Sequence, residues 1–222
     1  MELTQIIRRN NNAMKKKYKS KYISVLGDSI STFQGYNPDG FNVFYTPEKQ
    51  RLSGVISPED TWWGFVIKSL GGKLLINNSW SGSRVSKIPQ RVDEFPSGCS
   101  NERSGGLHSG DITPDVIIVY LGTNDWGYGV PLYRDMACGL CEIEVFDIAY
   151  ETMIARIKAN YPCAEVWCCT LCTTYMKSNP SFTFPYTFGG YHIEDYCDII
   201  KEKAQIFNCR LIDLYAENTP YS

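Results

Sequence analysis

Three polar turns of the sequence carry residue types that could perform acyl transfer. In the first turn, an apolar run from Tyr22 to Leu26 ends abruptly in Gly27-Asp28-Ser29. A short apolar run of this kind is typical of a buried strand, and a hydroxyl on the tight turn after it is a candidate nucleophile. Because Asp and Ser are also common caps and turn formers, this turn alone leaves a capping role equally open.

Acyl transfer also needs hydrogen-bond donors for the oxyanion that forms when a serine attacks a carbonyl. The second turn, residues 78–84, contains Gly82, and the third, residues 122–125, contains Asn124. The backbone N–H groups of Ser29 and Gly82 and the side-chain amide of Asn124 could supply three such donors. Taken singly, Gly82 and Asn124 are ordinary turn residues. Their occurrence at successive strand ends favours an oxyanion hole.

Strands must bring these turns together, and the apolar patterns predict five of them. The predicted strands are 22–26, 73–77, 116–121, 165–171 and 209–214, and helical patterns cover 58–70, 143–160 and 193–207. Residues 33–52, 96–114, 126–142 and 173–191 show no lasting period and are expected to be loops. The alternation predicts a single-domain α/β fold, a three-layer α/β/α sandwich around a flavodoxin-like five-stranded parallel sheet. Ligands bind at the carboxyl ends of the strands in such sheets, which is where the turns lie.

The three turns, in this order and at strand ends, resemble the first three sequence blocks of the SGNH (GDSL-type) hydrolase superfamily. The matching segments are Gly27 through Ser31, Asn78 through Gly82 and Gly122 through Asp125, and the resemblance extends over roughly residues 20–215. It implies that Ser29 is the nucleophile of a serine esterase and that Gly82 and Asn124 are oxyanion-hole donors. It also implies hydrolysis of small esters, often on acylated sugars. Residue 31 is serine, so the turn is not the Gly-x-Ser-x-Gly elbow of α/β-hydrolases.

The family's fourth block is an Asp-x-x-His that supplies the general base, and neither His108 nor His192 stands in such a pattern. We therefore expect a truncated hydrolase, with residues 1–20 an N-terminal extension and 21–222 a hydrolase-like domain that lacks this block and the helix after it. Such a chain should be nearly inactive, because a serine without a base is a weak nucleophile. Alternatively, His192, which follows an aromatic loop on the expected catalytic side, substitutes as the base. A structural role at a helix start is the more frequent one for such a histidine.

A non-catalytic carbohydrate-binding module on the same fold is an alternative function. Trp80, Trp126 and Tyr128 flank the second and third turns, and with Asp28 they are candidates for a substrate pocket. Their rings could stack on a sugar or pack an acyl group, although ordinary core or rim packing explains them equally well.

A zinc-binding protein is a less favoured alternative. Cys138 and Cys141 form one Cys-x-x-Cys pair, and Cys169 and Cys172 form another. However, Cys168 and Cys169 fall in a predicted strand, where alternate side chains point to opposite faces. We therefore expect no metal and no other cofactor.

The composition argues against several further classes. A net charge of −2 gives no electrostatic reason to bind nucleic acid or an anionic membrane, and the apolar runs are far too short to span a bilayer. No apolar signal segment follows the basic N-terminus, so the nine cysteines are expected as free thiols in the cytoplasm. The expected partner is a small ester substrate. An apolar face left bare by a missing helix would also favour a homo-oligomer.

Overall fold

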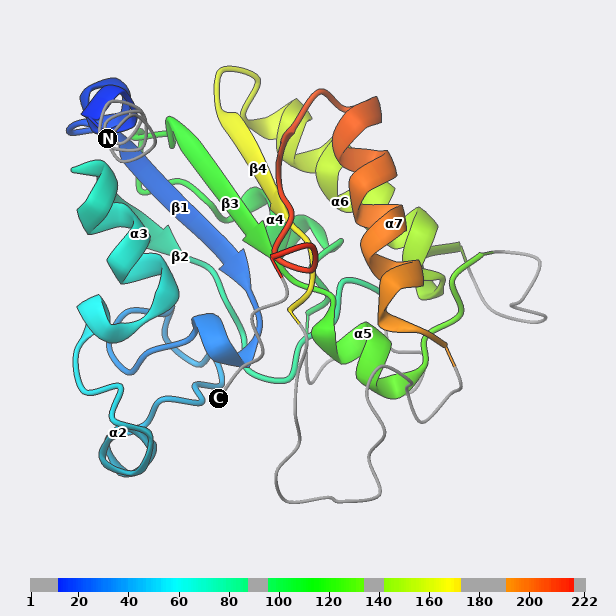
Figure 1. Cartoon of the computed structure of the whole chain (residues 1–222), viewed down its shortest axis with the longest axis horizontal. Helices are drawn as coiled ribbons and strands as arrows, with labels where there is room; N and C mark the ends of the chain where they lie inside the picture. Colours follow the sequence, from blue (N-terminus) through cyan, green and yellow to red (C-terminus); the bar gives the residue numbers. More distant parts are fainter. Residues whose placement is uncertain (1–11, 88–95, 134–141, 173–190, 218–222) are drawn as a thin grey trace, which may run out of the picture.

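The computed structural model of the chain describes residues 12–87, 96–133, 142–172 and 191–217. Five parallel strands form one sheet in the order β2-β1-β3-β4-β5. The strands are β1 (Tyr22–Gly27), β2 (Lys73–Asn77), β3 (Val116–Tyr120), β4 (Glu165–Cys169) and β5 (Arg210–Ile212). This is the strand order of a flavodoxin-like sheet, and it confirms the predicted fold class (Figure 1). The division into an extension, 1–20, and a domain, 21–222, stays a prediction.

Helices cover both faces of the sheet. α3 (Trp62–Leu70) packs on one face, and α6 (Phe146–Asn160) and α7 (Ile193–Ile206) pack on the other (Figure 1). The shorter helices are α2 (Pro47–Ser53), α4 (Asn101–Gly105) and α5 (Thr123–Tyr128), and the 3-10 turns are η1 (Ser29–Ser31), η2 (Pro58–Asp60) and η4 (Glu142–Glu144). Among the described residues, no helix is long and apolar enough to cross a membrane.

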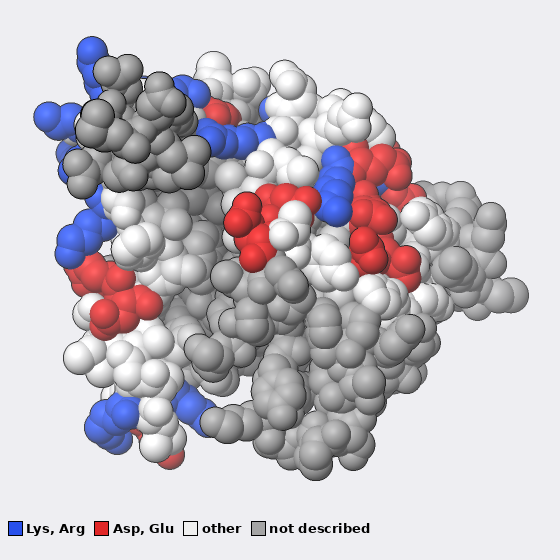
Figure 2. Space-filling model, viewed as in Figure 1, with Lys and Arg blue, Asp and Glu red and all other residues white. Residues whose placement is uncertain are grey.

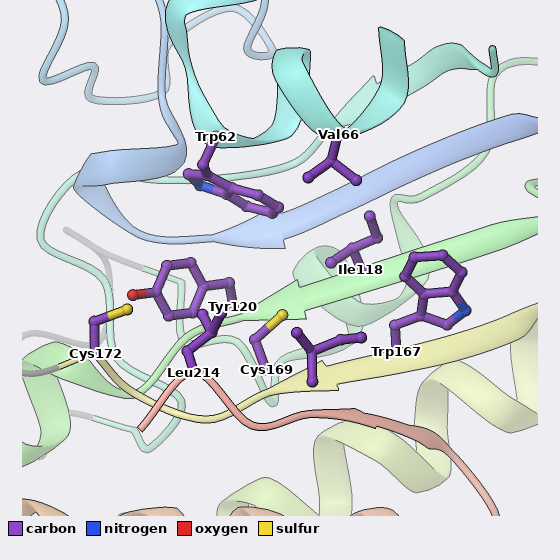
Figure 3. A pocket seen from close by; sticks show the side chains of 9 residues that line it. Trp62, Val66, Ile118, Tyr120, Trp167, Cys169, Cys172 and Leu214 are labelled. Atoms are coloured by element: carbon purple, nitrogen blue, oxygen red, sulfur yellow. The ribbon is translucent and has the colours of Figure 1, made fainter. Parts of the chain in front are cut away.

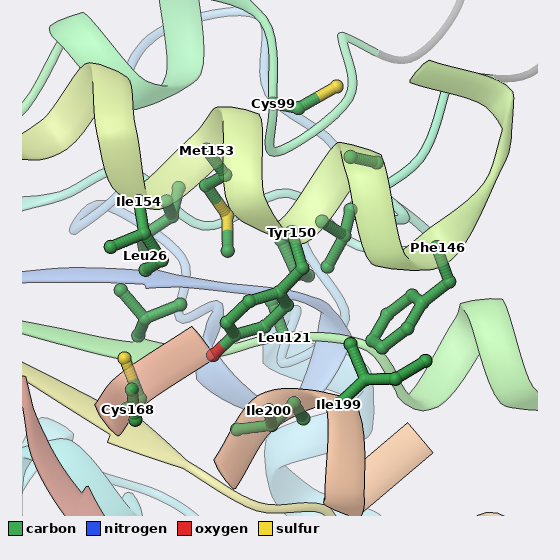
Figure 4. Packing of buried hydrophobic residues seen from close by; sticks show 14 of the residues in the cluster. Leu26, Cys99, Leu121, Phe146, Tyr150, Met153, Ile154, Cys168, Ile199 and Ile200 are labelled. Carbon is green, nitrogen blue, oxygen red and sulfur yellow. The ribbon is translucent and has the colours of Figure 1, made fainter. Parts of the chain in front are cut away.

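The strand β3 is the centre of the core. Every residue of this strand is buried, which explains its unbroken apolar run. Ile117 and Val119 belong to the layer under α6 and α7, whereas Ile118 and Tyr120 belong to the layer under α3. Figure 4 shows the first of these layers, in which Tyr150 of α6 points toward the sheet. One strand therefore anchors both helical layers.

The helix α3 begins four residues later than the sequence suggested. Pro58, expected at its first position, lies instead in the separate turn η2. Thr61 is the N-cap of α3, and its hydroxyl accepts a hydrogen bond from the Gly64 N–H at 3.1 Å. The expected inward face is confirmed for Trp63 and Ile67, which are both buried. Two consecutive capping signals, at residues 57 and 61, explain the difference, because either could start a helix.

Three segments expected to be turns or loops contain short helices. The helix α2 lies at the end of the predicted loop 33–52, and α4 lies within the predicted loop 96–114. The third polar turn is the first turn of α5, so Asn124 is helical. Helices of five to seven residues make at most two turns, too few for an apolar period to be recognised.

An apolar groove of about 270 Å³ lies between α3 and the strands β3 to β5 (Figure 3). Its lining is entirely hydrophobic or sulfur-containing and consists of Trp62, Val66, Ile118, Tyr120, Trp167, Cys169, Cys172, Ile212 and Leu214. The groove shows that the helical layer on this face leaves part of the sheet open within the described residues. Self-association through such a surface stays a prediction.

Charges of both signs lie on the face shown in Figure 2. Acidic side chains gather over α7, and basic side chains surround the N-terminal segment. The buried Lys203 of α7 contacts Asp147 at 2.6 Å and Glu151 at 3.0 Å. This ion cluster lies on the α6 and α7 side of the sheet.

Candidate active site

Ser29 begins the turn η1 directly after β1. Asp28 caps this turn, and its carboxylate accepts a hydrogen bond from the Ile30 N–H at 3.4 Å. Ser29 is half-buried, and its hydroxyl has no hydrogen-bond partner among the described residues. A Cβ at Gly27 would lie 2.3 Å from the Ser31 Oγ, so the turn folds back too tightly for a larger residue. Asp28 therefore takes the capping role, and the Ser29 hydroxyl is uncommitted.

The second turn is attached to the end of β1. The Trp80 N–H donates to the Gly27 carbonyl at 3.1 Å, and the Asn78 N–H donates to the Val25 carbonyl at 2.8 Å. Gly82 has a φ of +83°, a left-handed conformation that glycine adopts without steric cost. This backbone pairing brings the segment that carries Gly82 to the strand end that carries the serine.

The third turn is attached to the second. Asn124, half-buried in the first turn of α5, donates from its Nδ2 to the Ser83 carbonyl at 2.8 Å. A side-chain amide has two N–H donors, so one remains for a ligand. Because β1 lies between β2 and β3 in the sheet, the turn of Ser29 lies between the other two. The fold thus brings together the three turns that the sequence singled out.

Asp125 holds the segment that follows the second turn, a role that the sequence did not suggest. Its buried carboxylate accepts hydrogen bonds from the Val85 N–H at 2.8 Å, the Ser86 N–H at 3.0 Å and the Ser86 hydroxyl at 2.6 Å. Burial raises the pKa of Asp125 to about 6, although these donors act in the opposite direction. The carboxylate thereby fixes the chain that follows Gly82.

Asp28 is buried as well. Burial raises the pKa of Asp28 to about 7; the Ile30 N–H opposes this rise, the nearby Asp125 charge adds to it, and Arg103 opposes it. A carboxyl with only one hydrogen-bonded N–H and little water is poorly solvated, which favours its protonated form. The side chain faces inward, away from solvent, at 2 % exposure. Two buried carboxyls with raised pKa values therefore lie beneath the turns.

The candidate pocket aromatics have three different environments. Trp80 is half-buried and its ring lies 4.3 Å from that of Phe41, centroid to centroid. Trp126 is buried in the core under α6 and α7. Tyr128 is 70 % exposed, and the guanidinium of Arg84 stacks over its ring at 4.8 Å. Tyr128 and Trp80 are thus accessible to different degrees beside the turns, whereas Trp126 is a core residue.

His192, the candidate substitute base, is the N-cap of α7. Its Nδ1 accepts a hydrogen bond from the Glu194 N–H at 3.1 Å, and its main-chain N–H donates to the Asp195 carboxylate at 3.1 Å. With Nδ1 as the acceptor, the proton of the neutral ring resides on Nε2, and this tautomer offers no second lone pair. The geometry describes a capping residue. A role as base stays a prediction.

Only one of the two Cys-x-x-Cys pairs lies within the described residues. Cys138 and Cys141 lie outside the described residues. Cys168 faces α6 and α7, whereas Cys169 and Cys172 face the groove, so the strand separates neighbouring thiols as expected. Burial raises the pKa of Cys169 to about 12, which keeps this thiol protonated. Within the described ranges, no three His, Cys, Asp or Glu residues are placed to hold a metal ion.

The apolar groove begins beside the serine turn. The indole N–H of Trp62 donates to the Ser31 Oγ at 3.0 Å, and that of Trp63 donates to the Ser31 carbonyl at 2.9 Å. In Figure 3, Trp62 lies over the groove near the end of β1. The α3 helix therefore supports the turn of Ser29 and bounds the groove at the same time.

Known proteins resemble this chain in sequence and in fold. The model of the GDSL-like Lipase/Acylhydrolase family matches residues 21–183. A Bacteroides uniformis protein described as a GDSL-like lipase is 28% identical over 87% of this chain and 82% of its own, with a TM-score of 0.63. Another, from Bacteroides ovatus, is 24% identical over 88% and 86%, with a TM-score of 0.64. No curated protein sequence matches the chain. From the family match, which spans more than half of its length, the chain belongs to the GDSL-like lipase/acylhydrolase family.

Proposed function

We propose that this protein is a serine ester hydrolase that acts on small esters, acetylated carbohydrates among them, with Ser29 as the nucleophile. The observation that carries the proposal is a set of uncommitted groups at adjoining strand ends. Among the described residues, the N–H groups of Ser29 and Gly82 donate no hydrogen bond, and one N–H of Asn124 remains after its bond to Ser83. Membership of an acylhydrolase family supports the same chemistry.

In the proposed reaction, the Ser29 Oγ attacks the ester carbonyl and forms a tetrahedral intermediate. The oxyanion accepts hydrogen bonds from the Ser29 N–H, the Gly82 N–H and the second N–H of Asn124. Collapse of the intermediate expels the alcohol and leaves an acyl group on Ser29, which water then removes. Losing a single donor of such a hole typically costs about 10²–10³ in rate.

The proton of Ser29 needs an acceptor, and the chain offers a poor one. The sequence contains no Asp-x-x-His with either histidine, and the Nδ1 of His192 already accepts the N–H of Glu194. We therefore propose that turnover by this chain is slow, at the level that binding and the oxyanion hole sustain when a triad member is absent.

Labelling with a fluorophosphonate over a long incubation tests the nucleophile even when turnover is slow, because a single addition to each molecule is sufficient and no acyl-enzyme has to be hydrolysed. In this reaction, a serine oxygen forms a P–O bond, fluoride leaves and the hydroxyl proton passes to solvent. We expect a single adduct on Ser29, identified by mass spectrometry, that disappears in Ser29→Ala. The control Ser53→Ala changes an exposed serine at the end of α2 and should retain the adduct. Equal labelling of Ser29→Ala would refute the proposed nucleophile.

Carbohydrate binding without catalysis is the second candidate function. The exposed ring of Tyr128 beneath the Arg84 guanidinium supports it, since exposed aromatics are common stacking surfaces for sugars. An acetylated oligosaccharide should then saturate the protein without acetate release, and Tyr128→Ala should abolish the saturation. Acetate release at the same ligand concentrations would favour the hydrolase.

A further inference from the structure

Arg103 is the largest side chain that is fully buried in the described part of the molecule, although it carries a charge. It extends from α4, a helix of five residues capped by Ser100. Burial lowers the pKa of Arg103 to about 9, while the charges of Asp28 and Glu102 act in the opposite direction. Burying a cation is costly unless its donors are satisfied, so the partners of this guanidinium explain why it is there.

The guanidinium of Arg103 binds three main-chain carbonyls. Its Nη2 donates to Gly27 at 2.9 Å, its Nε donates to Asn78 at 3.0 Å, and its Nη1 donates to Pro96 at 3.0 Å. Gly27 is the last residue of β1 and precedes Asp28 and Ser29. Asn78 follows β2 and opens the segment that leads to Gly82. One side chain therefore joins the ends of the two strands that carry the backbone donors of the proposed oxyanion hole.

Asn78 completes this junction from the other side. Its Nδ2 donates to the carbonyl of Arg103 at 2.7 Å, while its own carbonyl accepts from the Arg103 Nε. The helix α4 and the end of β2 thus hold each other through a reciprocal pair of hydrogen bonds. Arg103 is thereby held both at its main-chain carbonyl and at its guanidinium.

Only arginine satisfies three carbonyls in three directions with one side chain. Its planar head presents five N–H donors in a rigid fork, whereas a lysine ammonium is a compact charge on a flexible stem. An apolar side chain of similar volume would fill the space without burying a charge and is often no less stabilising. The use of a buried charge at this place therefore points to a requirement for geometry.

We propose that Arg103 is a positioning residue for acyl transfer: it fixes the ends of β1 and β2 so that the N–H groups of Ser29 and Gly82 point to one oxyanion. The inference rests on the proposed function and adds a residue that contacts no substrate. A misplacement of about 1 Å in such a site can cost about 100-fold in rate.

The test compares two substitutions of Arg103 with a matched control. Arg103→Met removes the charge and the fork, and Arg103→Lys keeps the charge alone. The control, Lys203→Met, removes another buried cation, from the ion cluster with Asp147 and Glu151 on α6. For each variant we would measure the rate constant and the saturation constant of fluorophosphonate labelling at Ser29, and the folded fraction by circular dichroism.

We expect the maximal labelling rate to fall about 100-fold in Arg103→Met and about tenfold in Arg103→Lys, at an unchanged saturation constant and in fully folded protein. Lys203→Met should lower the melting temperature and leave the labelling rate within about twofold, because the two sites share no partner. If Arg103 only stabilised the fold, all three variants would be less stable. The maximal labelling rate of the two Arg103 variants would then not fall at an unchanged saturation constant.

Asn78→Ala provides a second route if Arg103→Met does not fold. This change removes the amide that holds α4 and leaves the carbonyl that accepts from Arg103, so labelling should slow by about threefold to tenfold. Normal labelling of folded Arg103→Lys and Asn78→Ala would overturn the role of Arg103 but leave the proposed function intact. Unfolding of Arg103→Lys would do the same. Absence of labelling in the wild-type protein would overturn the proposed function together with this inference.

Discussion

The carboxyl edge of the sheet consists of two unlike regions. At the ends of β2, β1 and β3, hydrogen bonds join Trp80 to Gly27 and Asn124 to Ser83, and the N–H groups of Ser29 and Gly82 donate no hydrogen bond among the described residues. Ahead of α7, by contrast, the described residues resume at Tyr191, and His192 is used as the N-cap of the helix. We propose the first region as the oxyanion hole, while the described part of the second begins a helix. In the proposed mechanism, oxyanion stabilisation is therefore separable from proton transfer, because the first region contains the proposed donors and no assigned base.

The largest effect is expected at the first region, from Asn124→Ala. Loss of this amide removes one oxyanion donor and the bond to the Ser83 carbonyl, so the labelling rate of Ser29 should fall by about 10²–10³. The exposed Asn160 at the end of α6 provides the control, Asn160→Ala, which should label normally. A rate that is unchanged in Asn124→Ala would show that the first region is not an oxyanion hole.

The stability of the first region should depend on pH. Burial raises the pKa of Asp28 to about 7 and that of Asp125 to about 6, above the value of 3.8 for an unperturbed aspartate. Between about pH 4 and 7 the folded protein therefore binds more protons than the unfolded chain, and the free energy of unfolding falls as the pH rises. We expect a lower melting temperature at pH 8 than at pH 5.

Asp28→Asn isolates the contribution of Asp28 to this slope. The amide cannot ionise, so the variant should lose less stability than the wild type between pH 5 and pH 8. An equally steep decline in both proteins would show that Asp28 does not titrate in this range.

A smaller effect is expected from Gly82→Ala. At a φ of +83° an alanine costs about 1–2 kcal/mol, which the loop can relieve by moving its N–H. The labelling rate should then fall by about tenfold. Gly54 provides the control, because it has a similar φ of +77° and no neighbour within 4 Å. Gly54→Ala should therefore lower the free energy of unfolding by a similar amount and leave the labelling rate of Ser29 unchanged. Equal rates in both variants would argue against a role for the Gly82 N–H.

The smallest effect is expected in the second region. As a cap, His192 contributes about 1 kcal/mol, so His192→Ala should lower stability by that amount and His192→Asn, a good cap, should restore it. Both variants should label at the wild-type rate within about twofold. A loss of several orders of magnitude in both variants would instead identify His192 as the base, and would remove the distinction between the two regions.

The sequence predicts the parts of this site that depend on local pattern. The apolar run before Ser29 and the fully apolar β3 identify buried parallel strands, and parallel strands place their carboxyl ends at one edge. The approach of the three turns follows from this arrangement, and the match to residues 21–183 agrees with the expected family.

The sequence does not predict the buried charges, because their partners are distant along the chain. Asp125 binds Ser86, 39 positions away, and Arg103 binds Gly27, 76 positions away. Arg103 also lies in a helix too short to show a period, in a segment that resembles a polar loop. Only the three-dimensional structure shows that this loop arginine is enclosed.

Intrinsic tryptophan fluorescence can report on the groove beneath α3. Trp62 and Trp167 both line this apolar surface, and the Trp62 indole also donates to the Ser31 Oγ, two residues from the nucleophile. Filling the groove would remove water from the half-buried Trp62 indole and shift its emission to shorter wavelength, whereas Trp167, at 4% exposure, should change little. Acylation of Ser29 that disturbs its turn would change the hydrogen bonds that the Trp62 and Trp63 indoles donate to Ser31. Intrinsic fluorescence, with Trp62→Phe and Trp63→Phe to assign the signals, can therefore follow the groove and the serine turn in an unlabelled protein.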